Sequence, residues 1–206
     1  MTSMMASHIA QIIGGSLSGN DVLVTSGASL KSSEVSQGGI FLAIAGEKVD
    51  GHDFVEDAFS HGAVLAITTR AVNQRHILVE DVSTALTALA RFVRSALKDV
   101  KVIGITGSQG KTTTKDLLRH MLSQHGETVA PSGNYNNELG VPLTLLACTE
   151  TTKYVVIEMG ARHSGDIAHL ASIARPDIAV VLRVGMAHVG EFGSVETIAK
   201  TKSELI

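Results

Sequence analysis

The feature that most constrains the fold is a glycine-rich turn, GITGSQGKTTT, at residues 104–114. The apolar segment before it, residues 101–106, is expected to be a strand, and a helix is expected over residues 111–124. In such a turn, backbone N–H groups and the helix N-terminus converge on phosphate oxygens. Gly107 and Gly110 permit the close approach that this requires. The turn therefore predicts an α/β domain with a phosphate-binding loop.

The two residues after the second glycine carry the chemistry of the loop. Lys111 is expected to reach the β- and γ-phosphates as a point charge, and Thr112 to offer its hydroxyl to magnesium. We therefore predict that the chain handles a nucleoside triphosphate, ATP with Mg²⁺. The residues expected to contact the nucleotide along the loop are Gly107, Ser108, Gln109, Gly110, Lys111, Thr112 and Thr113.

The loop departs from the strict Walker pattern, which places a glycine five positions before the glycine that precedes lysine. Ile105 occupies that position here, so the match is to a shorter G-x-x-G-K-T form. A glycine-rich turn can also be no more than a tight connection between a strand and a helix. The Lys111-Thr112 pair and the flanking strand and helix favour phosphate binding over that alternative.

From residue 99 onward, apolar strands alternate with helices of ten or more residues. Besides the strand and helix around the loop, we expect strands at 154–158 and 177–182 and a helix at 164–174. Such βα units imply a parallel sheet covered on both faces, with ligands outside the carboxyl ends of its strands. The sequence therefore predicts a P-loop, parallel-sheet ATPase domain over residues 99–206.

Shorter elements occupy residues 1–98. The elements expected there are helices at 7–13 and 55–60, strands at 39–45, 64–68 and 76–79, and a longer helix that Ser83 caps and that ends near Leu97. We therefore expect a small N-terminal α/β domain, with the domain boundary between residues 98 and 99.

Candidate metal ligands lie downstream of the loop. Glu158 directly follows the apolar strand YVVI, so its carboxylate is well placed to bind Mg²⁺. A salt bridge or a helix cap is the alternative. His188, within GMAHVGEFG, is a second candidate for metal or phosphate contact, although a lone loop histidine is more often only solvated. Lys200 and Lys202 lie on the last expected helix, where the simpler interpretation is a solvated basic face.

Composition limits the possible partners. Lys and Arg number 17 against 20 Asp and Glu, which gives no electrostatic reason to expect binding of nucleic acid or of a membrane surface. No run reaches the ~18 apolar residues that span a bilayer. The single cysteine, Cys148, excludes an internal disulfide. A cytoplasmic protein with small-molecule ligands is expected.

Several segments together resemble the Mur ligase family. They are GITGSQGKTTTKDLL (104–118), SGNYNNELGVPLTLL (132–146), VIEMGARHSGDIAHLASIARPDIAVV (156–181), AHVGEFGS (187–194) and AKTKSEL (199–205). Upstream, GGIFLAIAGEKVDGHDF (38–54) is similar to the uridine-nucleotide domain of the family. The resemblance covers nearly the whole chain, and the NNELGVP stretch resembles the family members that use D-alanyl-D-alanine.

The resemblance implies an ATP-dependent amide ligase of peptidoglycan precursor synthesis. ATP would phosphorylate the terminal carboxylate of UDP-N-acetylmuramoyl-tripeptide, and the amine of D-alanyl-D-alanine would attack the acyl phosphate. By the same resemblance, the catalytic residues are Lys111, Glu158, His188 and Lys202, and the metal or phosphate ligands are Thr112, Glu158, His188 and Lys202. Lys202 corresponds to the family lysine that reacts with carbon dioxide to form a carbamate. Asn136 and Asn137 correspond to positions near the phosphate and the substrate.

Two departures from the family qualify these expectations. The chain has Lys31-Ser32-Ser33 where family members often carry Asp-Ser-Arg. The family also has a longer central domain and a third, C-terminal domain, so the chain is expected to be a fragment that ends within the central domain. A P-loop kinase or NTPase, and a non-catalytic module that binds a nucleotide sugar, remain as alternative functions.

Overall fold

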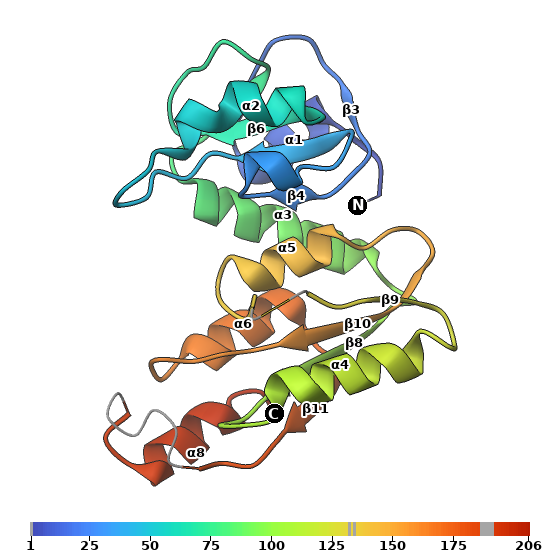
Figure 1. Ribbon diagram of the computed structural model, residues 1–206, viewed down its shortest axis with the longest axis vertical. Coiled ribbons are helices and arrows are strands. Elements are labelled where there is room, and N and C mark those ends of the chain that lie inside the picture. The colour runs from blue at the N-terminus through green and yellow to red at the C-terminus, as the bar shows by residue number, and fades with distance from the viewer. Residues whose placement is uncertain (1, 132, 134, 186–191) are drawn as a thin grey trace. The chain divides into compact units, whose positions relative to one another are not determined.

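The computed structural model describes residues 2–131, 133, 135–185 and 192–206 and divides into two compact units, residues 1–93 and 94–206 (Figure 1). The α/β class predicted from the sequence is confirmed. The division between the units falls inside helix α3 (Val82–Ala96), whereas the sequence places it after that helix. Among the helices that the structure describes, none has the length and apolar character needed to cross a membrane.

The first unit is built on a mixed sheet in the order β2-β7-β6-β5-β4. Within it, β2 pairs antiparallel with β7, and the remaining pairs are parallel. A separate antiparallel pair joins β1 to β3. The bounds of these strands are β1 (Met4–Met5), β2 (Ser16–Ser18), β3 (Leu23–Val24), β4 (Ala28–Ser29), β5 (Gly39–Leu42), β6 (Ala63–Thr68) and β7 (His76–Leu78).

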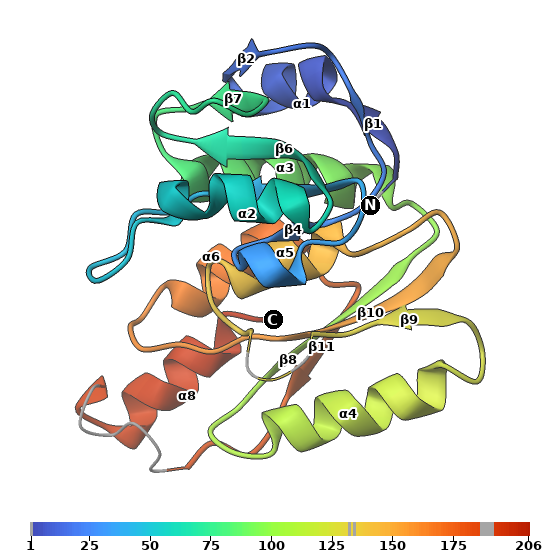
Figure 2. The same ribbon diagram turned by 45° about the horizontal axis from the view of Figure 1, so that its top comes forward.

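Helices cover both faces of this sheet. Helix α2 (Val55–Ser60) and α3 lie on opposite sides of it (Figure 2). On the α2 side, Val55 and Ala58 join a buried cluster with Phe41 and Ala66 of the sheet. The unit also contains α1 (Ala6–Ile13) and the 3₁₀ turns η1 (Ser32–Glu34) and η2 (Gly51–Phe54).

The start of α3 differs from the sequence prediction. The Asp81 carboxylate, rather than Ser83, caps the helix, because it accepts a hydrogen bond from the backbone N–H of Thr84 at 2.7 Å. A carboxylate also suits the partial positive charge of the helix N-terminus. The side-chain hydrogen bond from Thr84 is the largest cause that lowers the pKa of Asp81, and backbone hydrogen bonds from Thr84 and Ser83 lower it further.

The second unit is built on a parallel sheet in the order β11-β8-β10-β9. Its strands are β8 (Lys101–Thr106), β9 (Glu127–Val129), β10 (Thr152–Glu158) and β11 (Ile178–Val181). Helix α4 (Lys111–Leu122) covers one face, and α5 (Gly140–Leu146) and α6 (Asp166–Ala174) cover the other (Figures 1 and 2). Helix α8 (Val195–Ser203) follows, capped by Ser194. The sequence did not predict β9 or α5.

The order of the strands positions the site. From β8 the chain passes through α4 and over β10 to β9, and from β10 it passes through α6 and over β8 to β11. Right-handed connections that run in opposite directions place their helices on opposite faces of the sheet. The adjacent carboxyl ends of β8 and β10 therefore flank a topological switch point, where open α/β sheets bind ligands.

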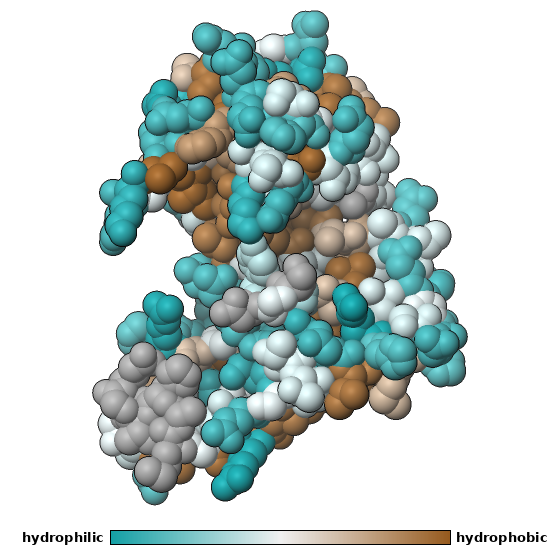
Figure 3. All heavy atoms as spheres, viewed as in Figure 1, coloured by the Kyte–Doolittle hydropathy of each residue, from teal (hydrophilic) through white to brown (hydrophobic). Residues whose placement is uncertain are grey.

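Strand β11 forms one edge of this sheet, and its surroundings expose apolar side chains. Ile178 is 50% exposed, and Leu117 and Met121 on α4 are 59% and 62% exposed. Figure 3 shows apolar atoms at the surface over α4 and β11. On the same side of the sheet, Val180 and Leu182 are only partly buried against the core cluster of Ile103, Ile105 and Val156.

Candidate phosphate-binding site

The glycine-rich turn leaves β8 after Thr106 and enters α4 at Lys111. Gly107 has φ +153°, and a Cβ added there would come within 2.7 Å of Leu182 Cβ. Gly110 has φ +84° and precedes the first residue of α4, where no side chain caps the helix. Because no side-chain cap is present, the N–H groups at the start of α4 are available to an anion.

The Lys111 ammonium lies over this turn. Its Nζ donates a hydrogen bond to the Gly107 carbonyl at 2.9 Å, and the side chain is partly buried. A lysine that bends back over its own loop places its charge beside the backbone N–H groups rather than in bulk solvent. Gln109 and Thr113 are exposed on either side of it.

Glu158 is the best-defined polar centre of the site. Its side chain is 2% exposed at the end of β10, where its Cα pairs with that of Ile105 in β8. The Thr112 hydroxyl donates to Oε2 at 2.9 Å, and the Asn136 amide donates to Oε1 at 2.8 Å. The structure thus brings together three of the residues predicted from separate segments of the sequence.

The oxygen atoms of Thr112 and Glu158 fit a magnesium ion. Both are hard oxygen donors, the type that Mg²⁺ prefers, and Mg²⁺ usually takes only one or two protein ligands beside substrate phosphates. The hydrogen bonds to Glu158 come from neutral groups, and no ion pair joins it to a basic residue in the described part of the chain. A cation would therefore balance a buried charge. Within the described residues, no group of three or more His, Cys, Asp or Glu side chains is arranged so that it could hold a metal ion.

Two further contacts hold the turn against its neighbours. The Thr106 hydroxyl donates to the Met159 carbonyl at 2.9 Å. Ser108 is tied to the segment after β11: its N–H donates to the Arg183 carbonyl at 3.0 Å, and its hydroxyl exchanges hydrogen bonds with the N–H and C=O of Gly185. Both polar groups of Ser108, which the sequence predicts as a nucleotide contact, are thus engaged within the protein.

Of the two lysines on α8, only Lys202 is buried, at 3% exposure, while Lys200 is exposed. Burial lowers the pKa of Lys202, and the positive charge of Lys111 lowers it further. The Lys202 ammonium lies 6.0 Å from the centroid of the Phe192 ring. The interpretation as a solvated face therefore fits Lys200 and does not fit Lys202. His188 lies outside the described residues.

Asn137 has a local role in the structure. Its Oδ1 accepts a hydrogen bond from the Gly140 N–H at 3.0 Å, at the start of α5. Its carbonyl also accepts from Val141. Asn136 points to Glu158 while Asn137 stabilises the helix start, so the two asparagines predicted as one pair act differently.

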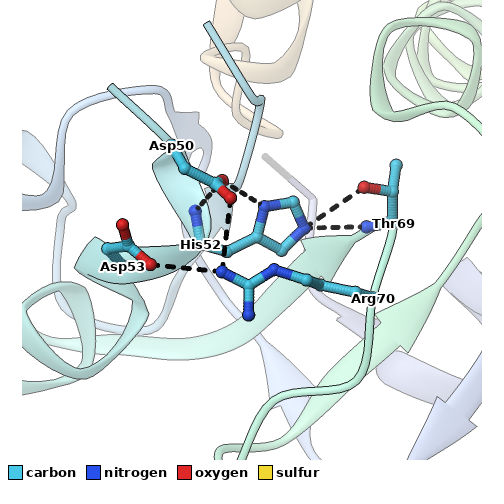
Figure 4. A network of polar contacts seen from close by, with 5 residues as sticks. All are labelled: Asp50, His52, Asp53, Thr69 and Arg70. Carbon is cyan, nitrogen blue, oxygen red and sulfur yellow. Dashed lines mark hydrogen bonds and ion pairs between the residues drawn. The ribbon is translucent and has the colours of Figure 1, made fainter. Parts of the chain in front are cut away.

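In the first unit, the DGHDF segment forms a separate polar network (Figure 4). Asp50 accepts from the backbone N–H of His52 at 2.9 Å and lies 2.6 Å from Nδ1 of the same residue. On the other side of the ring, Nε2 accepts from the Thr69 N–H at 3.0 Å. Because a backbone N–H can only donate, the proton of the neutral ring is assigned to Nδ1. Arg70 bonds to both Asp50 and Asp53.

The fold and the site together define a P-loop α/β protein with a second, smaller α/β unit. Comparison with family models makes this specific. The model described as the Mur ligase middle domain matches residues 105–206, and the model described as Mur ligase family, catalytic domain, matches residues 25–119. The chain belongs to the Mur ligase family.

Individual relatives agree with this assignment. The UDP-N-acetylmuramoyl-tripeptide–D-alanyl-D-alanine ligase of Mycobacterium tuberculosis is 42% identical over 234 aligned residues that include 100% of this chain. The ligase of the same name from Escherichia coli is 37% identical over 207 residues, again with 100% of this chain. The chain spans about half the length of these relatives, 46% and 45% respectively.

Solved structures extend the likeness to three dimensions. A crystal structure of MurF from Acinetobacter baumannii superimposes with a TM-score of 0.86 at 35% identity, over 98% of this chain and 46% of that one. MurF from Thermotoga maritima, solved in complex with ADP, gives a TM-score of 0.75 at 43% identity, over 89% of this chain and 43% of that one.

Proposed function

We propose that this chain is part of an ATP-dependent amide ligase and contains both the unit that binds the nucleotide-linked substrate and the loop that binds the phosphates of ATP. The ligase would join D-alanyl-D-alanine to UDP-N-acetylmuramoyl-tripeptide through an acyl phosphate, in the synthesis of the peptidoglycan precursor. Residues 1–98 would bind the uridine nucleotide, and residues 99–206 would bind ATP. The chain spans about half the length of its relatives, and we propose that the ligase activity also needs the C-terminal domain that the family carries.

The observation that carries this proposal is the convergence of Thr112, Asn136 and Glu158 beside the phosphate loop. These residues come from α4, from the segment before α5 and from the end of β10. A glycine-rich connection would need no buried carboxylate at the adjacent strand end. The family membership and the ADP bound in a similar structure support the same interpretation.

The geometry suits activation of a carboxylate. A carboxylate is a poor electrophile until one of its oxygens becomes part of a phosphate leaving group, and phosphoryl transfer gathers negative charge that cations must neutralise. Lys111 would bring its ammonium from the Gly107 carbonyl to the transferred phosphate. Thr112 and Glu158 would hold Mg²⁺, which supplies Lewis-acid stabilisation when bound.

Lys202 is proposed to carry the carbamate of the family. Its lowered pKa favours the neutral amine, the form that adds to carbon dioxide. The amine nitrogen bonds to the carbon of CO₂ and releases a proton, which leaves an anionic carbamate that can bind a cation. Measurement of the intact mass with and without bicarbonate tests this: retention of the unmodified mass in both samples would return Lys202 to a packing role. His188 is proposed as a further metal or phosphate contact.

Phosphate release tests the proposed reaction. The chain is assayed alone and after fusion to the C-terminal portion of the Mycobacterium tuberculosis relative, with ATP and Mg²⁺. Release that requires both UDP-N-acetylmuramoyl-tripeptide and D-alanyl-D-alanine supports the ligase. Release with ATP alone, or with a hydroxyl acceptor, would instead support an NTPase or kinase. Binding of the UDP substrate with no turnover by the fusion would support a non-catalytic module.

A further inference from the structure

Lys115 is a buried cation that the proposed reaction does not use. It lies on α4 one turn after Lys111, and its side chain is 1% exposed. Its Nζ donates to the carbonyls of Pro131 and Gly133 at 2.8 and 3.0 Å. The carboxylate of Asp116, 60% exposed, lies 3.4 Å away. A buried ammonium is costly unless it is hydrogen-bonded, so breaking either contact would cost free energy. The lysine and the two carbonyls therefore fix one another's positions.

The two carbonyls belong to the segment that leads to Asn136. At its far end this segment is packed closely: a Cβ on Gly140 would come within 2.4 Å of the Tyr135 backbone, and one on Gly160 within 2.9 Å of the Asn136 side chain. The Gly160 N–H also donates to the Asn136 carbonyl at 2.8 Å. The approach to Asn136 is therefore held from α4 at one end and from the residues after β10 at the other.

We propose that Lys115 is a positioning residue: by holding the carbonyls of Pro131 and Gly133, it sets Asn136 and, through it, the Glu158 carboxylate for binding of a magnesium nucleotide. Lys115 holds the Gly133 carbonyl, which belongs to a residue three positions before Asn136 in the chain, and the Asn136 amide donates to Oε1 of Glu158. The other oxygen of Glu158 takes its bond from Thr112, three residues before Lys115 on the same helix. Helix α4 thus controls both oxygens of Glu158, one directly and one through Lys115.

This inference rests on the proposed function, and it predicts the results of two measurements. Loss of Lys115 should loosen Pro131, Gly133 and Asn136 in the absence of any ligand. It should also weaken the tightening of nucleotide binding by Mg²⁺ while leaving magnesium-free binding by the glycine-rich turn intact. A residue that merely filled space would change overall stability without this division between the two modes of binding.

The experiment uses the full 206-residue chain and its variants Lys115→Met, Asn136→Ala and the double variant. Lys115→Met keeps the length of the side chain and removes its charge and donors. Asp116→Asn is the matched control, because it removes the neighbouring exposed charge and leaves both carbonyl contacts in place. Hydrogen exchange of residues 131–137 is measured without ligand, and ADP binding is measured by calorimetry with and without Mg²⁺.

We expect Lys115→Met to speed exchange in residues 131–137 and to reduce the magnesium-dependent tightening of ADP binding by about tenfold, the usual scale for residues that orient metal ligands. Affinity without Mg²⁺ should stay within about twofold, and Asp116→Asn should behave as the parent chain. The double variant should bind magnesium-ADP no more weakly than Asn136→Ala alone, because both changes act through one contact.

Additive losses in the double variant, or parental exchange in residues 131–137 of Lys115→Met, would overturn the inference. If Lys115→Met does not fold, Lys115→Gln, which retains a shorter donor, decides the same comparison with a smaller expected effect. A parent chain whose ADP binding does not respond to Mg²⁺ would contradict the proposed function instead. The exchange measurement needs no nucleotide, so it would still decide whether Lys115 holds the segment.

Discussion

The Glu158 carboxylate is buried and takes hydrogen bonds from two neutral donors, so a bound cation is the natural balance for its charge. Glu158→Gln keeps the size of the side chain but replaces one oxygen with a donor. Either Thr112 or Asn136 then faces an NH₂ group. We expect magnesium-dependent tightening of ADP binding to fall by at least about tenfold, with magnesium-free binding retained. Calorimetry with and without Mg²⁺ measures both.

Glu127→Gln is the matched control for this change. Glu127 lies in the same unit at the start of β9, where hydroxyls of Thr149, Thr151 and Thr152 donate to it. Its replacement should weaken the contact between β9 and residues 149–152 and leave the response of ADP binding to Mg²⁺ unchanged. An equal loss of the Mg²⁺ response in both variants would show that the effect of Glu158→Gln is not specific to the site.

Asp50 should make the stability of the first unit depend on pH. Hydrogen bonds from the backbone and the ring of His52 lower the pKa of Asp50 from 3.8 to about 2. A carboxyl whose pKa is lower in the folded state stabilises the fold above its unfolded pKa and loses that contribution as the pH falls through the folded value. The stability difference between the parent chain and Asp50→Asn should thus be constant above about pH 5 and shrink from about pH 4 to 2.

Denaturant unfolding across this pH range measures the difference. Asp53→Asn is the control, since Asp53 is 69% exposed and pairs with the Arg70 guanidinium rather than with His52. This variant keeps both contacts of Asp50 with His52. A gap between the parent chain and Asp50→Asn that stays the same from pH 5 to 2 would contradict the assigned network.

At the scale of elements, Arg94 joins three pieces of the second unit. Its guanidinium, in the last turn of α3, donates to the carbonyls of Ala174 and Arg175 at the end of α6 and to Asp177 before β11. It also donates to the Leu97 carbonyl. Arg94→Met should destabilise this unit by roughly 2 to 4 kcal/mol, because several buried acceptors lose their donor together.

Thermal or denaturant unfolding checks this, with Arg119→Met as a matched change on an exposed face of α4, expected to cost less than about 0.5 kcal/mol. Arg94→Lys should recover only part of the loss, since an ammonium cannot reproduce the planar fork of donors. Full recovery by lysine would mean that charge alone matters at this position.

An element can be predicted from the sequence when local residues define it, but not when contacts between distant segments define it. Strand β8, helix α4 and strand β10 were predicted because β8 and β10 are apolar segments and a glycine-rich turn separates β8 from α4. Strand β9 has three residues and α5 begins without a cap other than Asn137, so neither carries a strong local signal. The pairing of Thr112 and Asn136 on Glu158, and the burial of Lys115 and Lys202, arise from contacts between distant segments. Sequence patterns can identify such residues as candidates, but they do not show which of them lie close together in the fold.

At the scale of the whole molecule, the two units carry separate sheets, and the proposed function assigns a different ligand to each unit. The family match to residues 105–206 covers the second unit from the phosphate loop onward, and the match to residues 25–119 covers strands β4 to β7 of the first unit and extends through the same loop. If each unit binds its own nucleotide, each ligand should stabilise mainly the unit that holds it, because a ligand stabilises only the structure whose unfolding releases it.

Hydrogen exchange resolved by peptide tests this separation. ATP with Mg²⁺ at about 100 times its dissociation constant should add roughly 2.7 kcal/mol of protection, about a hundredfold slower exchange, to the core of residues 94–206. UDP-N-acetylmuramoyl-tripeptide should protect the core of residues 1–93 instead. Lys111→Ala should abolish the first effect and spare the second, because its ammonium belongs to the phosphate loop alone. Equal protection of both units by either ligand would mean that the two nucleotide functions are not divided as the fold divides the chain.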